Sequence, residues 1–267
     1  MPDHKIPFYQ VDAFADQAFS GNPAAVMPLD EWLPDATLQQ IAAENNLAET
    51  AFVVVCDGDD ADYELRWFTP AVEVGLCGHA TLATGHMLLS ADPALHHVRF
   101  RTRKAGVLEV ARDGNGYKLA LPAWEMRPKT LSQEMLGGIG GAPVETLWRD
   151  SGYALLVYKS AAEVRALDPD FRALKALGDI LFIATAPGDD TTIVSRAFAP
   201  GAGIDEDPVT GSAHCLLTTY WATRLGRNAF TAYQASARGG YLTCSLEGDR
   251  AVIGGRCVTV IEGVFTL

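Results

Sequence analysis

Three polar, glycine-bearing segments interrupt the apolar pattern of this 267-residue chain, and they hold the side chains best suited to acid/base chemistry. They are Gly21-Asn22-Pro23 with residues 45–50, residues 76–81, and residues 206–213. Glu49 stands between the polar end of a helical stretch and the apolar run Thr50–Val55. A carboxyl group partly buried there could both take and return a proton. By spacing alone, the commoner interpretation is a solvated glutamate at a helix end.

The second and third segments share one design, in which a glycine and small residues lead straight into an apolar helix. Such helix starts leave backbone N–H groups that can hold a carboxylate. His79 at the first start could orient or protonate a substrate, or be a hydrogen-bonded structural residue. Asp207, which precedes Pro208, could project into a cleft or form a turn. Cys77 could be a reactive thiolate or a small core residue.

Several cofactor and metal motifs are absent from the sequence. No GxGxxG dinucleotide loop, Walker phosphate loop or GxSxG elbow occurs, so nothing suggests a nicotinamide cofactor, a nucleoside triphosphate or a serine hydrolase. The His, Asp and Glu residues lack the spacing of a metal site, and the five cysteines form no CxxC pair. We therefore expect no cofactor and no metal.

The charge balance limits the possible partners. Acidic residues outnumber basic ones by 33 to 21, which gives a net charge of -12. Such a surface repels a phosphate backbone, so we expect no nucleic-acid partner. The sequence has no apolar targeting segment at its start and no stretch long enough to cross a bilayer. With widely spaced cysteines, this favours a cytoplasmic protein with reduced thiols and no membrane partner.

The elements that must position these residues are mostly strands. Period-two apolar runs in the first half predict strands at residues 8–14, 50–55, 63–68, 98–102, 107–111 and 117–121. Helical spacing predicts helices over Thr37–Asn46, His79–Leu89 and Ser212–Leu225, the last ending at Gly226. The plan repeats after Leu121-Pro122. A sheet wrapped around one apolar helix would bury both apolar faces, so we expect an α+β fold with two such units in tandem.

Five sequence blocks occur in an order that is more specific than any one of them. They are Phe19-Ser20-Gly21-Asn22-Pro23-Ala24-Ala25-Val26, Asn46-Leu47-Ala48-Glu49-Thr50-Ala51-Phe52, Arg66-Trp67-Phe68-Thr69-Pro70, Cys77-Gly78-His79-Ala80-Thr81 and Glu206-Asp207-Pro208-Val209-Thr210-Gly211-Ser212-Ala213. Through these blocks the chain resembles the PhzF family of phenazine biosynthesis-like proteins over nearly its whole length. The resemblance favours the functional interpretation of each residue above.

The resemblance implies a diaminopimelate epimerase-like fold: two similar domains, each a rolled, mostly antiparallel β-sheet around a central α-helix, with the active site in the cleft between them. Residues 1–122 would form the N-terminal domain, joined by the C-terminal strand 257–267, and residues 123–256 the C-terminal domain. The resemblance also implies a homodimer. Its implied activity is that of a cofactor-independent isomerase, which shifts a proton on a small carboxylate substrate by acid/base catalysis.

By the same resemblance, Glu49 shuttles the proton, and His79 and Asp207 assist it. The residues expected to bind the substrate are Asn22, Cys77, Gly78, Ala80, Thr210, Gly211 and Ser212. The backbone N–H groups at the two helix starts would hold the substrate carboxylate.

One departure bears on the alternatives. The chain has Cys77 where the diaminopimelate epimerase relatives carry a catalytic cysteine, but Asp207 rather than a second cysteine in the opposite motif. This disfavours a symmetric two-thiol racemase. Two alternatives stay open: an amino-acid epimerase or racemase that uses Cys77 or Asp207 as its second group, and a catalytically silent, protein-binding member of the fold.

Overall fold

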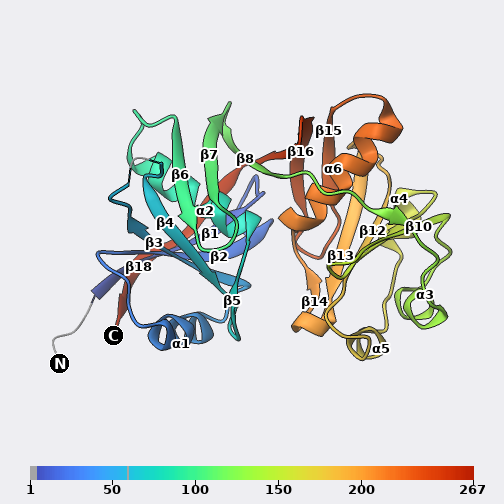
Figure 1. Cartoon of the computed structure of the whole chain (residues 1–267), viewed down its shortest axis with the longest axis horizontal. Coiled ribbons are helices and arrows are strands. Elements are labelled where there is room, and N and C mark those ends of the chain that lie inside the picture. Colours follow the sequence, from blue (N-terminus) through green and yellow to red (C-terminus); the bar gives the residue numbers. More distant parts are fainter. Residues whose placement is uncertain (1–4, 59) are drawn as a thin grey trace. The chain divides into compact units, whose positions relative to one another are not determined.

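The structure is a computed structural model that describes residues 5–58 and 60–267, and it divides the chain into two compact units (Figure 1). The first unit holds the described residues up to Leu121 together with Val252–Leu267, and the second holds Pro122–Ala251. The C-terminal strand β18 (Cys257–Thr266) belongs to the first unit because it pairs antiparallel with β1 (Lys5–Ala13).

The first unit is a curled sheet around helix α2 (Gly78–Ala91). Its other elements are β2 (Asn22–Leu29), α1 (Asp35–Asn45), β3 (Glu49–Val55), β4 (Tyr63–Phe68), β5 (Glu73–Val74), β6 (His97–Thr102), β7 (Val107–Asp113) and β8 (Gly116–Pro122). The pairs β2/β3 and β4/β6 are parallel, and the others described in this unit are antiparallel. Strands β1, β2, β3, β6, β7 and β18 all contact α2, so the helix is buried on several sides.

The second unit follows the same plan around helix α6 (Gly211–Leu225). Its other elements are β9 (Arg127–Pro128), α3 (Gln133–Ile139), β10 (Glu145–Arg149), β11 (Tyr153–Val157), α4 (Ala161–Arg165), α5 (Phe171–Lys175), β12 (Leu181–Pro187), β13 (Ile193–Ala199), a 3₁₀ turn (Pro200–Ala202), β14 (Ile204–Asp207), β15 (Ala229–Gln234) and β16 (Gly240–Glu247). Strand β17 (Arg250–Gly255) begins in the second unit and continues into the first at Val252. The parallel pairs are β11/β12 and β13/β15.

The order of parallel and antiparallel pairs is the same in both units. The sequence β1, β2, β3, β4, β6, β7 corresponds to β10, β11, β12, β13, β15, β16, with α2 and α6 at the same place in each series. The expected α+β fold of two similar units with mostly antiparallel pairing is therefore confirmed.

Alternation along the strands decides which side chains reach the central helix. Phe52 and Val54 of β3 pack in one apolar cluster with Leu38 and Ile41 of α1 on the outer face of the sheet. Successive strand residues point to opposite faces, so the side chain of Glu49 lies on the inner face, where β3 contacts α2.

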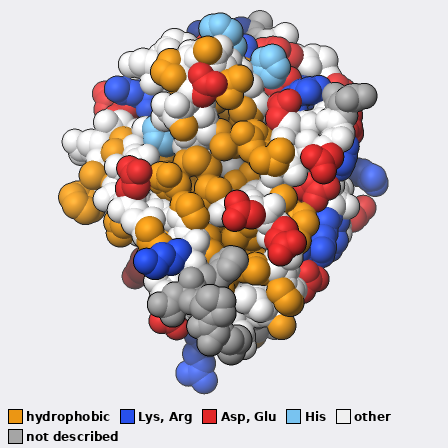
Figure 2. Space-filling model, turned by 90° about the vertical axis from the view of Figure 1, so that its left-hand side faces the viewer, with side chains coloured by type: hydrophobic (Ala, Val, Ile, Leu, Met, Phe, Trp, Pro, Cys, Tyr) orange, Lys and Arg blue, Asp and Glu red, His pale blue; other side chains and the backbone are white. Residues whose placement is uncertain are grey.

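Hydrophobic side chains gather on the face of the molecule drawn in Figure 2, with charged side chains mostly around them. Strand β18 of the first unit carries exposed Ile261 and Val264. Contiguous apolar surface often marks a contact with another chain, and the homodimer stays a prediction. Among the described residues, no helix is both long enough and apolar enough to span a membrane.

Candidate active site

Glu49 is placed by the abrupt end of helix α1. Asn46 follows the helix in a left-handed conformation, with φ 49°, and its N–H donates to the carbonyl of Ala42. The chain then enters β3 at Glu49, beside Ala24 of the parallel strand β2. The Glu49 side chain is only 13% exposed, so this carboxyl group is largely withdrawn from water.

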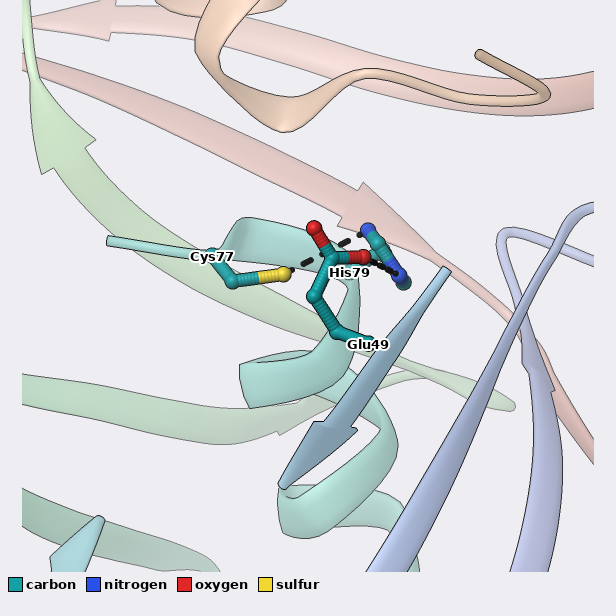
Figure 3. Close-up of side chains that lie close together, drawn as sticks. All are labelled: Glu49, Cys77 and His79. Carbon is teal, nitrogen blue, oxygen red and sulfur yellow. Dashed lines mark hydrogen bonds and ion pairs between the residues drawn. The ribbon is translucent and has the colours of Figure 1, made fainter. Parts of the chain in front are cut away.

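His79 meets Glu49 from the first turn of α2 (Figure 3). Its Nε2 lies 3.0 Å from Oε2 of Glu49, and the His79 side chain is 5% exposed. Both atoms are buried, and within the described part of the chain neither has a hydrogen bond of good geometry. Buried polar atoms are normally paired, so this pair is well suited to contact a bound molecule.

The other ring nitrogen of His79 is held by two neighbours. The amide nitrogen of Asn22 lies 3.3 Å from Nδ1, and Sγ of Cys77 lies 3.5 Å from it. Asn22 is fully buried at the start of β2. It follows Gly21, which has φ +66° and on which a Cβ would lie 2.2 Å from the carbonyl oxygen of Ala13. The sequence Gly21-Asn22 therefore fixes one support of the imidazole ring.

Charge coupling sets the protonation of this group. Burial alone lowers the pKa of His79, but the adjacent Cys77 and Glu49 outweigh burial and raise the pKa well above its ordinary value. Burial raises the pKa of the Cys77 thiol, and the charge of Glu49 adds to that effect. The arrangement favours an imidazolium beside the Glu49 carboxylate.

The same three side chains offer a mixed set of metal ligands. One ligand atom from each of Glu49, Cys77 and His79 lies within 4.8 Å of the others. Sequence spacing did not indicate this cluster, because Glu49 comes from β3 and the other two come from the start of α2.

In the second unit, Asp207 and Thr210 form a tight local structure. The hydroxyl of Thr210 donates to Oδ2 of Asp207 at 2.6 Å. Gln234, fully buried at the end of β15, donates from Nε2 to the carbonyl of Asp207 at 2.8 Å and to the Thr210 hydroxyl at 3.0 Å. Its Oε1 accepts the backbone N–H of Thr210 at 2.9 Å. These bonds fix the Asp207 carboxylate at the start of α6.

Strand registers show which residues are equivalent in the two units. The pairing of β3 with β4 begins at Thr50 and Phe68, and the pairing of β12 with β13 begins at Phe182 and Phe198. Leu181, which precedes Phe182, therefore occupies the position of Glu49, which precedes Thr50. Cys77 is the N-cap of α2 and Thr210 is the N-cap of α6, so these two residues are equivalent. The first helical residues, Gly78 and Gly211, are then equivalent as well. Ser212 thus replaces His79, and the second unit lacks a copy of the Glu49–His79 pair.

The two helix starts remain suited to binding an anion. Among the described residues, neither the Cys77 nor the Thr210 side chain caps its own helix, and neither first turn contains an acidic residue. Gly78, Ala80 and Gly211 at these starts are buried and carry little or no side chain over the backbone. Unpaired N–H groups and the helix dipole both favour a carboxylate there.

Comparison with known proteins identifies the family. Residues 11–263 match the family described as phenazine biosynthesis-like protein. The chain belongs to this family. A relative in Pseudomonas aeruginosa named an uncharacterized isomerase is 47% identical over 98% of this chain and 100% of its own length. The crystal structure of a PhzF family protein from Enterococcus faecalis has a TM-score of 0.91 and 42% identity, covering 99% of this chain and 100% of that one.

A more distant structure shows the wider fold. A hydroxyproline epimerase from Agrobacterium vitis has a TM-score of 0.65 at 14% identity, covering 100% of this chain and 93% of that one. The PhzF family resemblance and the epimerase-like fold expected from the sequence are both confirmed.

The predicted PhzF family site residues lie in two clusters, one in each unit. Asn22, Glu49, Cys77 and His79 form one cluster in the first unit. Asp207 and Thr210 form another in the second unit, next to Gly211 and Ser212. Two further residues beside this second cluster were not predicted from the sequence, namely Gln234 and Tyr153. The hydroxyl of Tyr153 interacts with Ser212, and burial raises the pKa of Tyr153. Neither residue stands in a polar motif that could have marked it.

Proposed function

We propose that this protein is a cofactor-independent isomerase that moves a proton between two carbon atoms of a small carboxylate substrate. The observation that carries the proposal is the buried contact of 3.0 Å between Glu49 and His79 at the start of α2. Relatives named isomerases support the general class of reaction.

In the proposed reaction, the Glu49 carboxylate accepts a proton from a substrate carbon and returns it to a second carbon of the same molecule. Negative charge develops on the substrate between these two steps. The His79 imidazolium and the amide groups at the start of α2 stabilise that charge without reorganising. Glu49 is 13% exposed, so the proton that it carries exchanges with solvent before it is returned, and the product takes up solvent hydrogen.

We propose that the start of α6 within the second unit is also suited to hold a carboxylate. The amides of Gly211 and Ser212 would bind the carboxylate, and Asp207 would accept a hydrogen bond from a ligand N–H or O–H group. The Thr210 hydroxyl holds the carboxylate of Asp207 and Gln234 holds its backbone carbonyl, which supports this role.

The asymmetry of the two units favours isomerisation over epimerisation. A two-base epimerase needs one proton donor on each face of the reacting carbon. Leu181 and Ser212 stand at the positions equivalent to Glu49 and His79, so the second unit does not supply a second base of this kind. A single base returns its proton to the face from which it came.

The test is proton exchange followed by NMR in deuterium oxide. The panel contains dihydroanthranilate-type acids, β,γ-unsaturated carboxylates, proline and trans-4-hydroxy-L-proline, the last being the ligand bound in the fold neighbour from Agrobacterium vitis. Isomerisation of a panel member with deuterium in the product is expected. Glu49→Gln should reduce its rate by about 10²- to 10⁴-fold.

The control is Glu64→Gln, which makes the same chemical change at a glutamate of β4 that is 38% exposed and bonded to Trp32. It should leave the rate within about twofold of the unchanged protein. Near-normal turnover by Glu49→Gln would reject the role of Glu49. Inversion of proline or hydroxyproline, measured by chiral chromatography, would favour the epimerase alternative.

A further inference from the structure

We infer that Glu49, Cys77 and His79 together form a binding site for a thiophilic divalent cation of the Zn²⁺ class, and that the bound cation switches the protein off. The inhibitory part rests on the proposed function, since it assumes that Glu49 and His79 transfer the proton. The binding part stands on the three side chains alone.

The ligand chemistry fits such a cation. Carboxylate oxygen, imidazole nitrogen and thiolate sulfur are the three kinds of side-chain ligand that Zn²⁺ takes, and three protein ligands with one open position are common in accessible zinc sites. Ligand atoms about 2.0–2.3 Å from a tetrahedral ion lie roughly 3.3–3.7 Å from one another. Here Oε2 of Glu49 and Nε2 of His79 are 3.0 Å apart, and one ligand atom from each of the three residues lies within 4.8 Å of the others. The Cys77 sulfur is 3.5 Å from Nδ1, the other ring nitrogen, so the three groups surround an ion at Nε2 once the Cys77 side chain rotates toward that nitrogen.

The burial of these side chains and the unmet hydrogen-bonding capacity of their polar atoms also support a cation site. Cys77 and His79 are buried, and Oε2 of Glu49 and Nε2 of His79 have no well-aligned hydrogen bond among the described residues. A cation would satisfy both atoms at once. Asn22 beside Nδ1 of His79 supplies the kind of outer contact that fixes the orientation of a metal-bound imidazole.

Binding has a defined proton balance. As the metal bonds form, the thiol of Cys77 and the imidazolium of His79 each lose one proton to solvent, so the ion binds a thiolate and a neutral imidazole. The carboxylate of Glu49 is then a ligand and can no longer accept a proton from carbon. A loaded protein therefore has neither of the groups that the proposed reaction needs, and a chelator should restore both.

The experiment uses Co²⁺ on the full-length, chelator-treated protein, because thiolate-bound cobalt has a charge-transfer absorption that carboxylate or imidazole sites lack. The expected result is one Co²⁺ per chain with this absorption, displaced by Zn²⁺. Cys77→Ser should abolish the absorption. Cys56→Ser is the matched control, since Cys56 is a free, half-buried thiol outside the cluster, and it should leave the absorption unchanged.

Two further results decide the proposal. Glu49→Gln, which keeps the size of the side chain, should weaken Co²⁺ binding by at least about tenfold, since even outer contacts of a metal contribute that much. Absorption that persists in Cys77→Ser, or that disappears in Cys56→Ser, would overturn the site. Circular dichroism of each variant shows that it is folded.

The inhibitory part is measured separately as proton exchange with and without Zn²⁺, reversed by a chelator. Exchange that continues at full rate in the Zn²⁺-loaded protein would overturn the inhibition and leave the binding site standing. An absence of exchange in the metal-free protein would count against the proposed function and not against the cation site, which the cobalt spectrum tests alone.

Discussion

Gln234 and Thr210 bond to each other in both directions: the Thr210 N–H donates to Oε1 of Gln234 at 2.9 Å, and Nε2 of Gln234 donates to the Thr210 hydroxyl at 3.0 Å. Gln234→Leu would keep the approximate volume but leave the Thr210 N–H and the Asp207 carbonyl without their partner. Unpaired buried groups cost about 1–3 kcal/mol each. We therefore expect the free energy of unfolding to fall by roughly 3 kcal/mol or more in urea denaturation.

Gln39→Leu is the matched control for this change. Gln39 makes a single hydrogen bond, from Nε2 to the carbonyl of Thr69 at 2.9 Å, at a half-buried position. Its loss should cost about 1 kcal/mol. Equal costs for the two variants would show that the Gln234 bonds do not hold the start of α6.

The raised pKa of His79 predicts a loss of stability at mildly alkaline pH. Above the ordinary histidine value of about 6.5, the folded protein keeps a proton that the unfolded chain has lost. The stabilisation is complete below that pH and decreases as pH rises through the folded pKa, with a slope of up to about 1.4 kcal/mol per pH unit. Urea denaturation between about pH 6.5 and 8.5, below the ordinary thiol pKa, isolates the effect from Cys77.

His79→Gln should remove this slope, while His96→Gln, at an exposed position, should keep it. Parallel curves for the unchanged protein and His79→Gln would mean that Glu49 does not hold the proton on His79.

Local chemistry explains what the sequence could predict. Helix α6 was expected to end at Gly226, and that residue does adopt the left-handed conformation of a C-cap, with φ 62°. The helices around residues 37–46 and 79–89 were also placed within two residues at each end. Helix ends depend on residues that are adjacent in the chain, so they can be predicted without knowledge of the tertiary fold.

Strand β2 shows what the sequence could not predict. No strand was predicted over residues 22–29, which contain Pro23 and Pro28, yet this segment pairs with β1 on one side and with β3 on the other. Pairing on both sides overrode the usual avoidance of proline in a strand. The same limit applies to Gln234, whose partners lie 24–27 residues away and are set by the tertiary fold.

Gly85 lies where α2 packs tightly against β7. A Cβ on Gly85 would lie 2.4 Å from Cγ1 of Val110 in β7. Gly85→Ala should therefore destabilise the protein by about 1–3 kcal/mol through overpacking. Gly137→Ala in α3, where no atom lies within 4 Å of the added carbon, should instead stabilise it by about 0.4–1 kcal/mol. Thermal unfolding measures both, and a neutral or stabilising Gly85→Ala would contradict the close packing of α2 against β7.

His214 should make the protein sensitive to acid, with the opposite sign to His79. Burial lowers its pKa to about 4, although its Nδ1–H donates to the carbonyl of Thr210 at 2.8 Å. Below about pH 6.5 the unfolded chain binds a proton that the folded protein refuses, so stability falls as pH drops toward 4, by about 3 kcal/mol in all. Carboxylates contribute to acid unfolding as well, and the test is therefore the difference between two variants.

His214→Gln retains a hydrogen-bond donor. In urea denaturation, its free energy of unfolding should fall less between about pH 6.5 and 4 than that of His96→Gln. Profiles of equal slope would mean that the imidazole of His214 is protonated inside the folded unit.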